Sequence, residues 1–570
     1  MELPLMRSFF LLLLLLCSCQ PQPRQIQEEN IGDLPSPPFS ELTNRSLLDP
    51  AAISINTSSI KEGVVSLQKV VSAPHLQRAH LEEVCYQLFQ KLATSDDLDT
   101  TIMTLFATTA ANHPLSRSII KELLHSPSPL IQLVAVQSLS QTNDADSLLV
   151  EALRSNFIGI RLEAAWQLAK KRSKDSFFHI DALYSKLSKE FHPYMAELFA
   201  QEGSSGSIHR LRNMLYDTDE AIVISSLLAI GRHNISDLNN DVVSLTLHSP
   251  QTLEALAYAL QCNESCAARE RLHELSNHYD SHVQVQALLS RIFLGELSFI
   301  ETLLQQAQQG DPFALSALSS CPALPHTPYS PTSRTERINH AITLLKHKEC
   351  ASLPYLKEIF SLADDEILFS RVSSAGTQQY VEPSTLYSFP ADTRSMIYEH
   401  SLVVLEELLS QTIELEESAF LEITQYLFQQ GRIELYPTLL SLLKNKRSDA
   451  TIELLKKEAS RVGAPYNRVS ASLGLIQLGI FSERDLKEVL DFTRAKKEQP
   501  WRHPLPHMFT TQYLDQRHQT TTSAQLYVEA LEMLAQSGSQ EAISMLQEEL
   551  EHVPMHFLPF VVGALLHATL

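Results

Sequence analysis

Glycine is scarce in this chain of 570 residues: the 15 glycines are about 3% of the total, where roughly 7% is usual. All-β folds need glycine-rich turns, so this scarcity argues against them. Hydrophobic residues make up 44% of the chain, and Gln, Glu and Ser are common among the rest, a mixture that favours helices. The chain is too long for one compact core, so we expect several domains or a repeat array.

Positive charge is also in short supply. The chain has 45 Lys and Arg against 66 Asp and Glu, which gives a formal net charge of −21. Nucleic-acid binding needs concentrated Lys and Arg to neutralise phosphates, so no nucleic-acid partner is expected. Solubility is a sufficient reason for the acidity.

The apolar run near the N-terminus is too short to cross a bilayer. Arg7 is followed by eight apolar residues, Phe9 to Leu16, whereas a membrane-spanning helix needs about 20. A positive charge before a short apolar run is typical of a signal peptide, which we expect at residues 1–18.

The residues after this run resemble the lipobox of bacterial lipoproteins. Leu16 lies three places before Cys19, and the small Ser18 directly precedes it; the alternative acceptor, Cys17, would follow the bulky Leu16. The resemblance implies that Cys19 becomes the lipidated N-terminus, where several acyl chains hold far better than one. Gln20 stands where Asp would imply retention in the inner membrane, so the resemblance favours the outer membrane.

Residues 19–58 are predicted to form a lipidated tether. Residues 20–50 hold six prolines among Gln, Asn, Ser and Glu, and such a segment cannot bury enough apolar surface to fold. We therefore expect an exported protein that is anchored to the bacterial membrane by lipid, with the tether lifting the folded part away from it.

A degenerate motif recurs further along the chain. In its clearest form an apolar residue is followed four places on by a small one and four places later by Leu, as in Ile131, Ala135 and Leu139. Copies begin at 131, 160, 222, 252, 283 and 467, and the first five are separated by 29, 62, 30 and 31 residues. The separation of 62 residues is twice the repeat length and leaves room for a copy near Tyr194. The copy at 283 ends in Arg291 instead of an apolar residue.

These copies resemble HEAT repeats, and Ile160, Arg161 and Ala164 match that family best. The resemblance implies an all-α fold, an α-solenoid of stacked antiparallel helix pairs with irregular inserted loops. Ala164 is expected to face the interior between pairs and Glu163 to face water. The spacing disfavours a tetratricopeptide array, whose repeat is about 34 residues.

Proline-rich breaks divide the helical region. We expect HEAT-like repeats over 59–320, a Pro-rich linker over 321–340 and a second helical block over 341–498. That block carries an inserted loop at 368–390, and a loop with C-terminal helices follows over 499–570. Long loops are more often functional or disordered than simple connections between helices.

No catalytic motif stands out. His273 and His278 flank a stretch like a zinc-protease signature, but residues i and i+5 lie about 140° apart on a helix, and two ligands on one face need i and i+4. Ser-x-x-Lys stretches at 118–121 and 441–444 lack the companion motifs of penicillin-binding enzymes. We therefore expect no enzyme, no metal and no cofactor.

Five cysteines remain after Cys17 and Cys19. Cys85 lies on an apolar helical face, which indicates core packing. Cys262 and Cys266 flank a predicted turn between helices. An oxidising periplasm would permit a disulfide between them, and two reduced thiols are the alternative.

Two further features are candidate partner-binding sites. Residues 399–434 carry eight Glu and one basic residue, whereas 444–468 carry seven basic residues and three acidic ones. Solvated helix faces account for this pattern, with a bipolar docking surface as the alternative.

Trp501 and Arg502 lie between prolines, and these residue types are enriched at binding hot spots. Alternatively, Trp501 fills a gap between helices.

These features predict a lipid-anchored, exported helical-repeat scaffold that binds another envelope protein or peptide. Solenoids present extended surfaces for such binding, although a fold alone does not determine function. The alternative is a structural or assembly factor of the cell envelope. A remote alternative is a lyase, because HEAT-like repeats occur in lyases that attach pigments to proteins.

Overall fold

The computed structural model describes residues 59–72, 78–110, 116–139, 145–173, 175–362, 405–496, 517–537 and 539–569. Within these ranges the chain is helical and has no β-strand, so the predicted all-α class is confirmed. None of the described helices is both long and apolar enough to cross a membrane. The predicted signal peptide (1–18), tether (19–58) and inserted loop (368–390) lie outside the described residues.

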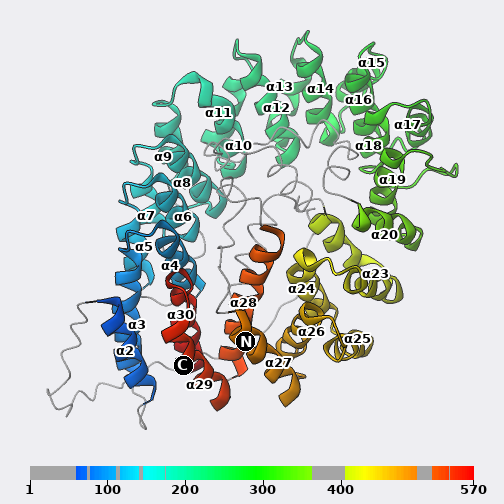
Figure 1. The fold of residues 1–570 in the computed structure, drawn as a ribbon. Coiled ribbons are helices and arrows are strands. Elements are labelled where there is room, and N and C mark those ends of the chain that lie inside the picture. Colours follow the sequence, from blue (N-terminus) through cyan, green and yellow to red (C-terminus); the bar gives the residue numbers. More distant parts are fainter. Residues whose placement is uncertain are drawn as a thin grey trace, which may run out of the picture.

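The first part of the chain alternates between an outer and an inner row of helices (Figure 1). Each inner helix packs against the inner helices before and after it, as expected for stacked pairs. The inner helices are α4 (Leu98–Ala110), α6 (Pro129–Leu139), α8 (Ile158–Lys171), α10 (His192–Glu202), α12 (Glu220–His233), α14 (Pro250–Ala259), α16 (Ser281–Phe293) and α18 (Pro312–Leu318). The outer helices are α5 (Ser116–Leu123), α7 (Asp146–Ala152), α9 (Ser176–Tyr184), α11 (Ser205–Met214), α13 (Asn239–Ser244), α15 (Cys266–Leu275) and α17 (Phe299–Gln308), and α2 (Ile60–Val71) and α3 (Arg78–Ala93) precede them.

The second part continues the stack and turns back toward the start (Figure 1). Its helices are α19 (Arg334–Lys346), α20 (Leu353–Ser361), α23 (Glu417–Gln430), α24 (Tyr436–Lys446), α25 (Asp449–Ala459), α26 (Pro465–Gln477), α27 (Glu483–Lys496), α28 (Arg517–Ser537), α29 (Gln540–His552) and α30 (Leu558–Thr569). Short 3₁₀ helices, such as η3 (Leu260–Cys262), cover several of the turns. Since α19 begins at Arg334, the irregular segment is shorter than the linker predicted at 321–340.

The solenoid closes on itself. The last helix, α30, packs against α3 and α4, and α29 packs against α2. Buried apolar residues from both ends of the chain, from Leu67 to Leu566, belong to the same hydrophobic core. The helices therefore form a ring in which the C-terminal helices fill the space beside the N-terminal ones (Figure 1).

The repeat motif marks the buried face of the inner helices. The small residues of four copies, Ala135, Ala164, Ala287 and Ala471, have no exposed surface. The gap between the copies at 160 and 222 is filled by α10, which packs between α8 and α12. A small side chain at this position lets neighbouring helices approach closely, so the predicted interior position of Ala164 is confirmed.

The expectation that Glu163 faces water is wrong, because only 4% of this residue is exposed. Inner helices are covered on two sides, by the outer helix of their own pair and by neighbouring inner helices, so the residue beside Ala164 is also enclosed. The carboxylate accepts a hydrogen bond of 2.8 Å from Nε2 of Gln167. Burial raises the pKa of Glu163 above its ordinary value.

Four successive inner helices begin in the same way. The side chain of the residue before each helix accepts a hydrogen bond from backbone N–H groups of the first turn, which would otherwise be unsatisfied. These N-caps lie 30, 31 and 31 positions apart, matching the repeat: Asp219, Ser249, Asp280 and Asp311.

Arginine–carboxylate pairs join successive outer helices. Nη2 of Arg210 on α11 lies 3.0 Å from Oδ2 of Asp181 on α9, and Nε of Arg212 lies 3.1 Å from Oδ2 of Asp241 on α13. Both pairs span 29 positions. Because each partner lies in a different repeat, the pairs fix how one repeat sits on the next.

Candidate interaction surface

One edge of the ring carries a compact polar network among the turns of α14 to α17. Here the chain passes from inner α14 to outer α15, and from inner α16 to outer α17. Arg269 on α15 joins the two turns: Nη2 donates to the backbone oxygen of Leu294 (3.1 Å), and Nη1 lies 3.4 Å from Oε1 of Glu296. We call the residues at these turns the edge surface; they are Cys262, Cys266, Arg269, Arg291, Phe293, Glu296 and Leu297.

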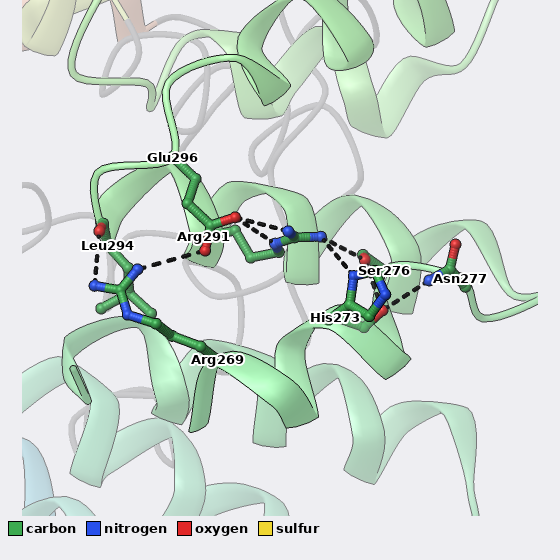
Figure 2. Close-up of polar contacts among 7 residues, drawn as sticks. All are labelled: Arg269, His273, Ser276, Asn277, Arg291, Leu294 and Glu296. Atoms are coloured by element: carbon green, nitrogen blue, oxygen red, sulfur yellow. Dashed lines mark hydrogen bonds and ion pairs between the residues drawn. The ribbon is translucent and has the colours of Figure 1, made fainter. Parts of the chain in front are cut away.

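Arg291 lies at the centre of the network (Figure 2). Its Nε and Nη2 donate to Oε2 of Glu296 at 3.0 and 2.7 Å. Its Nη1 donates to Oγ of Ser276 (3.0 Å) and lies 3.3 Å from Nδ1 of His273. The guanidinium carbon is 4.0 Å from the centre of the Phe299 ring, so a cation–π contact adds to the ion pair.

The network accounts for the irregular repeat copy that ends in Arg291. In other copies this position holds an apolar residue that packs between helices, such as Leu139 or Leu168. The Arg291 side chain remains only 12% exposed, and its charge is balanced by Glu296. Since a guanidinium offers several donors in a fixed plane, the residue links α15, α16 and the turn before α17.

Apolar side chains lie open to solvent beside this network. Phe293, the last residue of α16, is 47% exposed, and Leu297 in the following turn is 48% exposed. A rigid polar centre with exposed aromatic and aliphatic neighbours is the composition of protein-binding hot spots, which favour aromatic residues and Arg. The edge surface can therefore present a firm, amphipathic patch to another protein.

Cys262 and Cys266 lie on the same edge, at the end of η3 and at the first residue of α15. Both are exposed, and both are free thiols in the structure, so the disulfide that the sequence left open is not formed there. Partial burial raises the pKa of the Cys262 thiol.

The two histidines that flank the stretch resembling a zinc-protease signature contact different partners. Nδ1 of His273 contacts Arg291 (3.3 Å), whereas Nδ1 of His278 accepts a hydrogen bond from the backbone N–H of Asp280 (3.1 Å). Among the described residues, no group of three or more His, Cys, Asp or Glu could hold a metal ion. The stretch therefore stabilises the end of α15 and the following turn.

A small hollow lies on the inner row, between α14, α16 and α18. Its lining is mostly apolar but includes Glu254, His282 and Phe313. The remaining lining residues are Val285, Gln286, Leu289 and Ala317. Sequence reasoning missed this site. Its one signal is that Glu254 lies in the repeat copy that begins at 252 and His282 directly precedes the copy that begins at 283, and these two copies stack side by side.

Some charged residues of the two blocks contact other parts of the described chain. Nζ of Lys446 donates to the backbone oxygens of Ile413 (2.7 Å) and Leu415 (3.0 Å). Lys357 pairs with Glu422 at 2.5 Å. Other charges of the two blocks, such as Glu417 and Arg447, are exposed, as both solvated helix faces and a bipolar docking surface require. Cys19, Trp501 and Arg502 lie outside the described residues.

Comparisons with known proteins find distant helical chains. No family model and no curated protein matches the sequence. A chain in a homology model of the full-length AP-3 complex matches 89% of this chain and 98% of its own length, at 13% identity and a TM-score of 0.30. Yeast importin-beta matches 90% of this chain and 73% of its own length, at 11% identity and a TM-score of 0.28. None of these likenesses assigns the chain to a family.

Proposed function

We propose that this chain is a lipid-anchored scaffold of the bacterial cell envelope that binds another envelope protein or peptide through the edge surface. The observation that carries the proposal is the exposure of Phe293 and Leu297 around the Arg291 network. Isolated exposed apolar residues are ordinary, but here two of them flank a fixed arginine, a residue type enriched in interfaces.

Anchoring by Cys19 is supported by its lipobox-like context alone. The 40 residues from 19 to 58 separate that cysteine from the first described helix. As a tether, this segment would let the ring reach partners in the same membrane or next to it.

The anchor is tested by metabolic acyl labelling of the full chain. We expect Cys19→Ala to abolish the label and Cys17→Ala to retain it, because only Cys19 is preceded by a small residue. The label is the decisive readout, since an uncleaved signal peptide can itself retain a protein on the membrane. A labelled Cys19→Ala variant would contradict the assignment.

The edge surface is tested by a photo-crosslinking amino acid placed at Phe293 in intact envelopes. We expect one defined crosslinked product, and none when the same group is placed at Val462, which is 95% exposed but far along the chain. Equal products at both sites would mean random collision and would overturn the proposal. The stoichiometry and lifetime of the captured complex distinguish a regulated scaffold from a permanent assembly factor.

A further inference from the structure

The connection between α18 and α19 has a proline at every third position. These prolines are Pro322, Pro325, Pro328 and Pro331. Residues three apart share one face of a polyproline II helix, which has three residues per turn. The chain bends at 322–323 and 326–327 but runs without a bend or turn over 328–332. We call residues 328–331 the proline strap.

The strap is stiff and extended for local reasons. A proline ring fixes its own φ at about −65°, and the residue before a proline is confined to extended conformations. These rules fix φ at Pro328 and Pro331 and extend Ser330 between them. The backbone of residues 328–331 makes no hydrogen bond to any described residue. A fixed, extended backbone without internal hydrogen bonds is the character of polyproline II.

Two glutamates hold the chain on either side of the strap. Before it, Oε1 of Glu301 on α17 accepts hydrogen bonds from the backbone N–H groups of His326 (2.5 Å) and Thr327 (3.2 Å). After it, Oε2 of Glu336 on α19 accepts from the backbone N–H (2.7 Å) and Oγ1 (3.0 Å) of Thr332. A segment that is already held in one conformation loses little entropy when it binds a partner.

Tyr329 and Thr332 show which face of this stretch turns toward the ring. Tyr329 packs against the apolar cluster of α16, α17 and α18, and Thr332 is hydrogen-bonded to α19. These residues are three apart, as Pro328 and Pro331 are, so the two prolines share a different face. Pro328 and Ser330 are exposed, and Pro331 is half-buried. The connection extends away from the ring (Figure 1).

The strap adjoins the edge surface. Glu301, which holds the chain just before the strap, lies four residues after Leu297 of that surface. We infer that the strap docks into an aromatic-lined groove of the same partner protein that binds the edge surface. Such grooves accept Pro-x-x-Pro segments, whose extended conformation is already formed before binding. The inference rests on the proposed function and adds the chemistry of the partner.

The test places a photo-crosslinking amino acid at Thr327, an exposed residue directly before the strap, in intact envelopes. We expect it to capture the same protein that is captured from Phe293. The double variant Ser330→Pro with Pro331→Ser keeps the composition but changes the proline spacing from three to two, and should reduce the product at least tenfold. Pro322→Ser leaves the strap intact and should not reduce it. No product, a different protein, or a product insensitive to the proline spacing would each overturn the inference.

A competing peptide tests the spacing without altering the fold. The peptide of residues 326–333, His-Thr-Pro-Tyr-Ser-Pro-Thr-Ser, is added to detergent-solubilised envelopes that contain the full chain. It should suppress the Thr327 product, and the peptide with its second proline moved one place forward should need at least tenfold more. Equal competition by the two peptides would overturn the inference.

Mapping the crosslink tests the chemistry of the groove. We expect the captured site on the partner to lie beside Trp or Tyr residues, and a site without them would overturn the inference. Failure of the two proposals is distinguishable. If Phe293 yields a product and Thr327 does not, only the strap inference fails, whereas no product at Phe293 means that the proposed function fails.

Discussion

Nε2 of Gln68, on the first described helix, donates a hydrogen bond of 2.8 Å to Oε1 of Glu551 on α29, across 483 positions of sequence. The bond is exposed and contributes little stability by itself. It marks the seam of the ring, where the apolar α30 lies against α3 and α4.

The seam should respond to side-chain size at Gly563. A Cβ added there would lie 3.8 Å from the backbone oxygen of Ala107 and 4.0 Å from Cζ of Phe89, which are ordinary contact distances, so Ala fits. We expect Gly563→Leu to lower the free energy of unfolding by about 1–3 kcal/mol and Gly563→Ala to leave it nearly unchanged. Spin labels at 68 and 551 should show a short distance in the Ala variant and a longer, broader one in the Leu variant. Identical distances would mean that α30 does not hold the seam.

The close approach of α12 and α14 requires a glycine. A Cβ on Gly231 would lie 2.8 Å from Cδ1 of Tyr258 and 3.0 Å from Cα of Ala259, and the backbone atom cannot rotate away. Gly231→Ala should therefore reduce the free energy of unfolding by about 1–3 kcal/mol in a urea titration. Gly563→Ala is the matched control, and equal stability of the two variants would show that the helices are not so close.

The Arg291 network should contribute more than an ordinary surface ion pair. Arg291→Met removes the donors to Glu296, Ser276 and His273, and we expect a loss of about 1–3 kcal/mol in the free energy of unfolding. Arg271 pairs with Glu274 in an exposed position, where such pairs contribute about 0–1 kcal/mol. Arg271→Met should thus be nearly neutral. Similar losses in the two variants would show that the network adds no special stability.

Glu406 should make stability depend on pH. Oε1 accepts a hydrogen bond of 3.0 Å from Thr438, Oε2 has no partner among the described residues, and burial raises the pKa from 4.5 to about 7. The folded chain therefore binds this proton more tightly than the unfolded chain. The free energy of unfolding should fall as pH rises from about 4.5 to above 7, by up to about 3 kcal/mol.

Urea titrations at pH 5.5 and pH 8 measure that dependence. Glu406→Gln removes the titrating group, so it should be more stable than the wild type at pH 8 and should lose part of the pH dependence. Glu417→Gln, an exposed acid on α23, should titrate like the wild type. A Glu406→Gln variant with the wild-type pH profile would contradict the assignment.

The cysteines should differ in reactivity. Cys85 and Cys321 are buried, and burial raises the pKa of each thiol to about 12, so alkylation should need unfolding. Cys266 and Cys262 are exposed and should react in the folded chain, with Cys262 the slower because of its raised pKa. Mass spectrometry of the alkylated protein, purified without reductant, gives the order in which these four thiols react. If Cys262 and Cys266 react only after reduction, the exported protein carries the disulfide.

Local periodicity was enough to predict the helix pairs. The positions of Ala135, Ala164 and Ala471 follow from the repeat, because a small residue recurs wherever inner helices meet. The burial of Glu163 could not be predicted in this way, since it depends on neighbours in adjacent repeats. For the same reason Arg291 was visible as an irregularity, while its partners became clear only in three dimensions.

The seam had no sequence signal, and the hollow had only the spacing of two repeat copies. Gln68 and Glu551 meet through the summed curvature of all the intervening repeats, and no short window of sequence encodes that sum. The lining of the hollow depends on which side chains of α16 and α18 turn toward Glu254. Sequence spacing places those helices side by side but does not set their rotamers.

An open solenoid can lengthen by duplication, because each terminal repeat offers a face on which one more can stack. In this protein α30 already occupies that face of α4. One helix pair more or fewer would move α30 away from its contact with α3 and α4. Apolar surface would then be exposed on α30 and on the N-terminal helices. The circumference thus fixes the number of repeats, and changes in length are confined to the connections between helices.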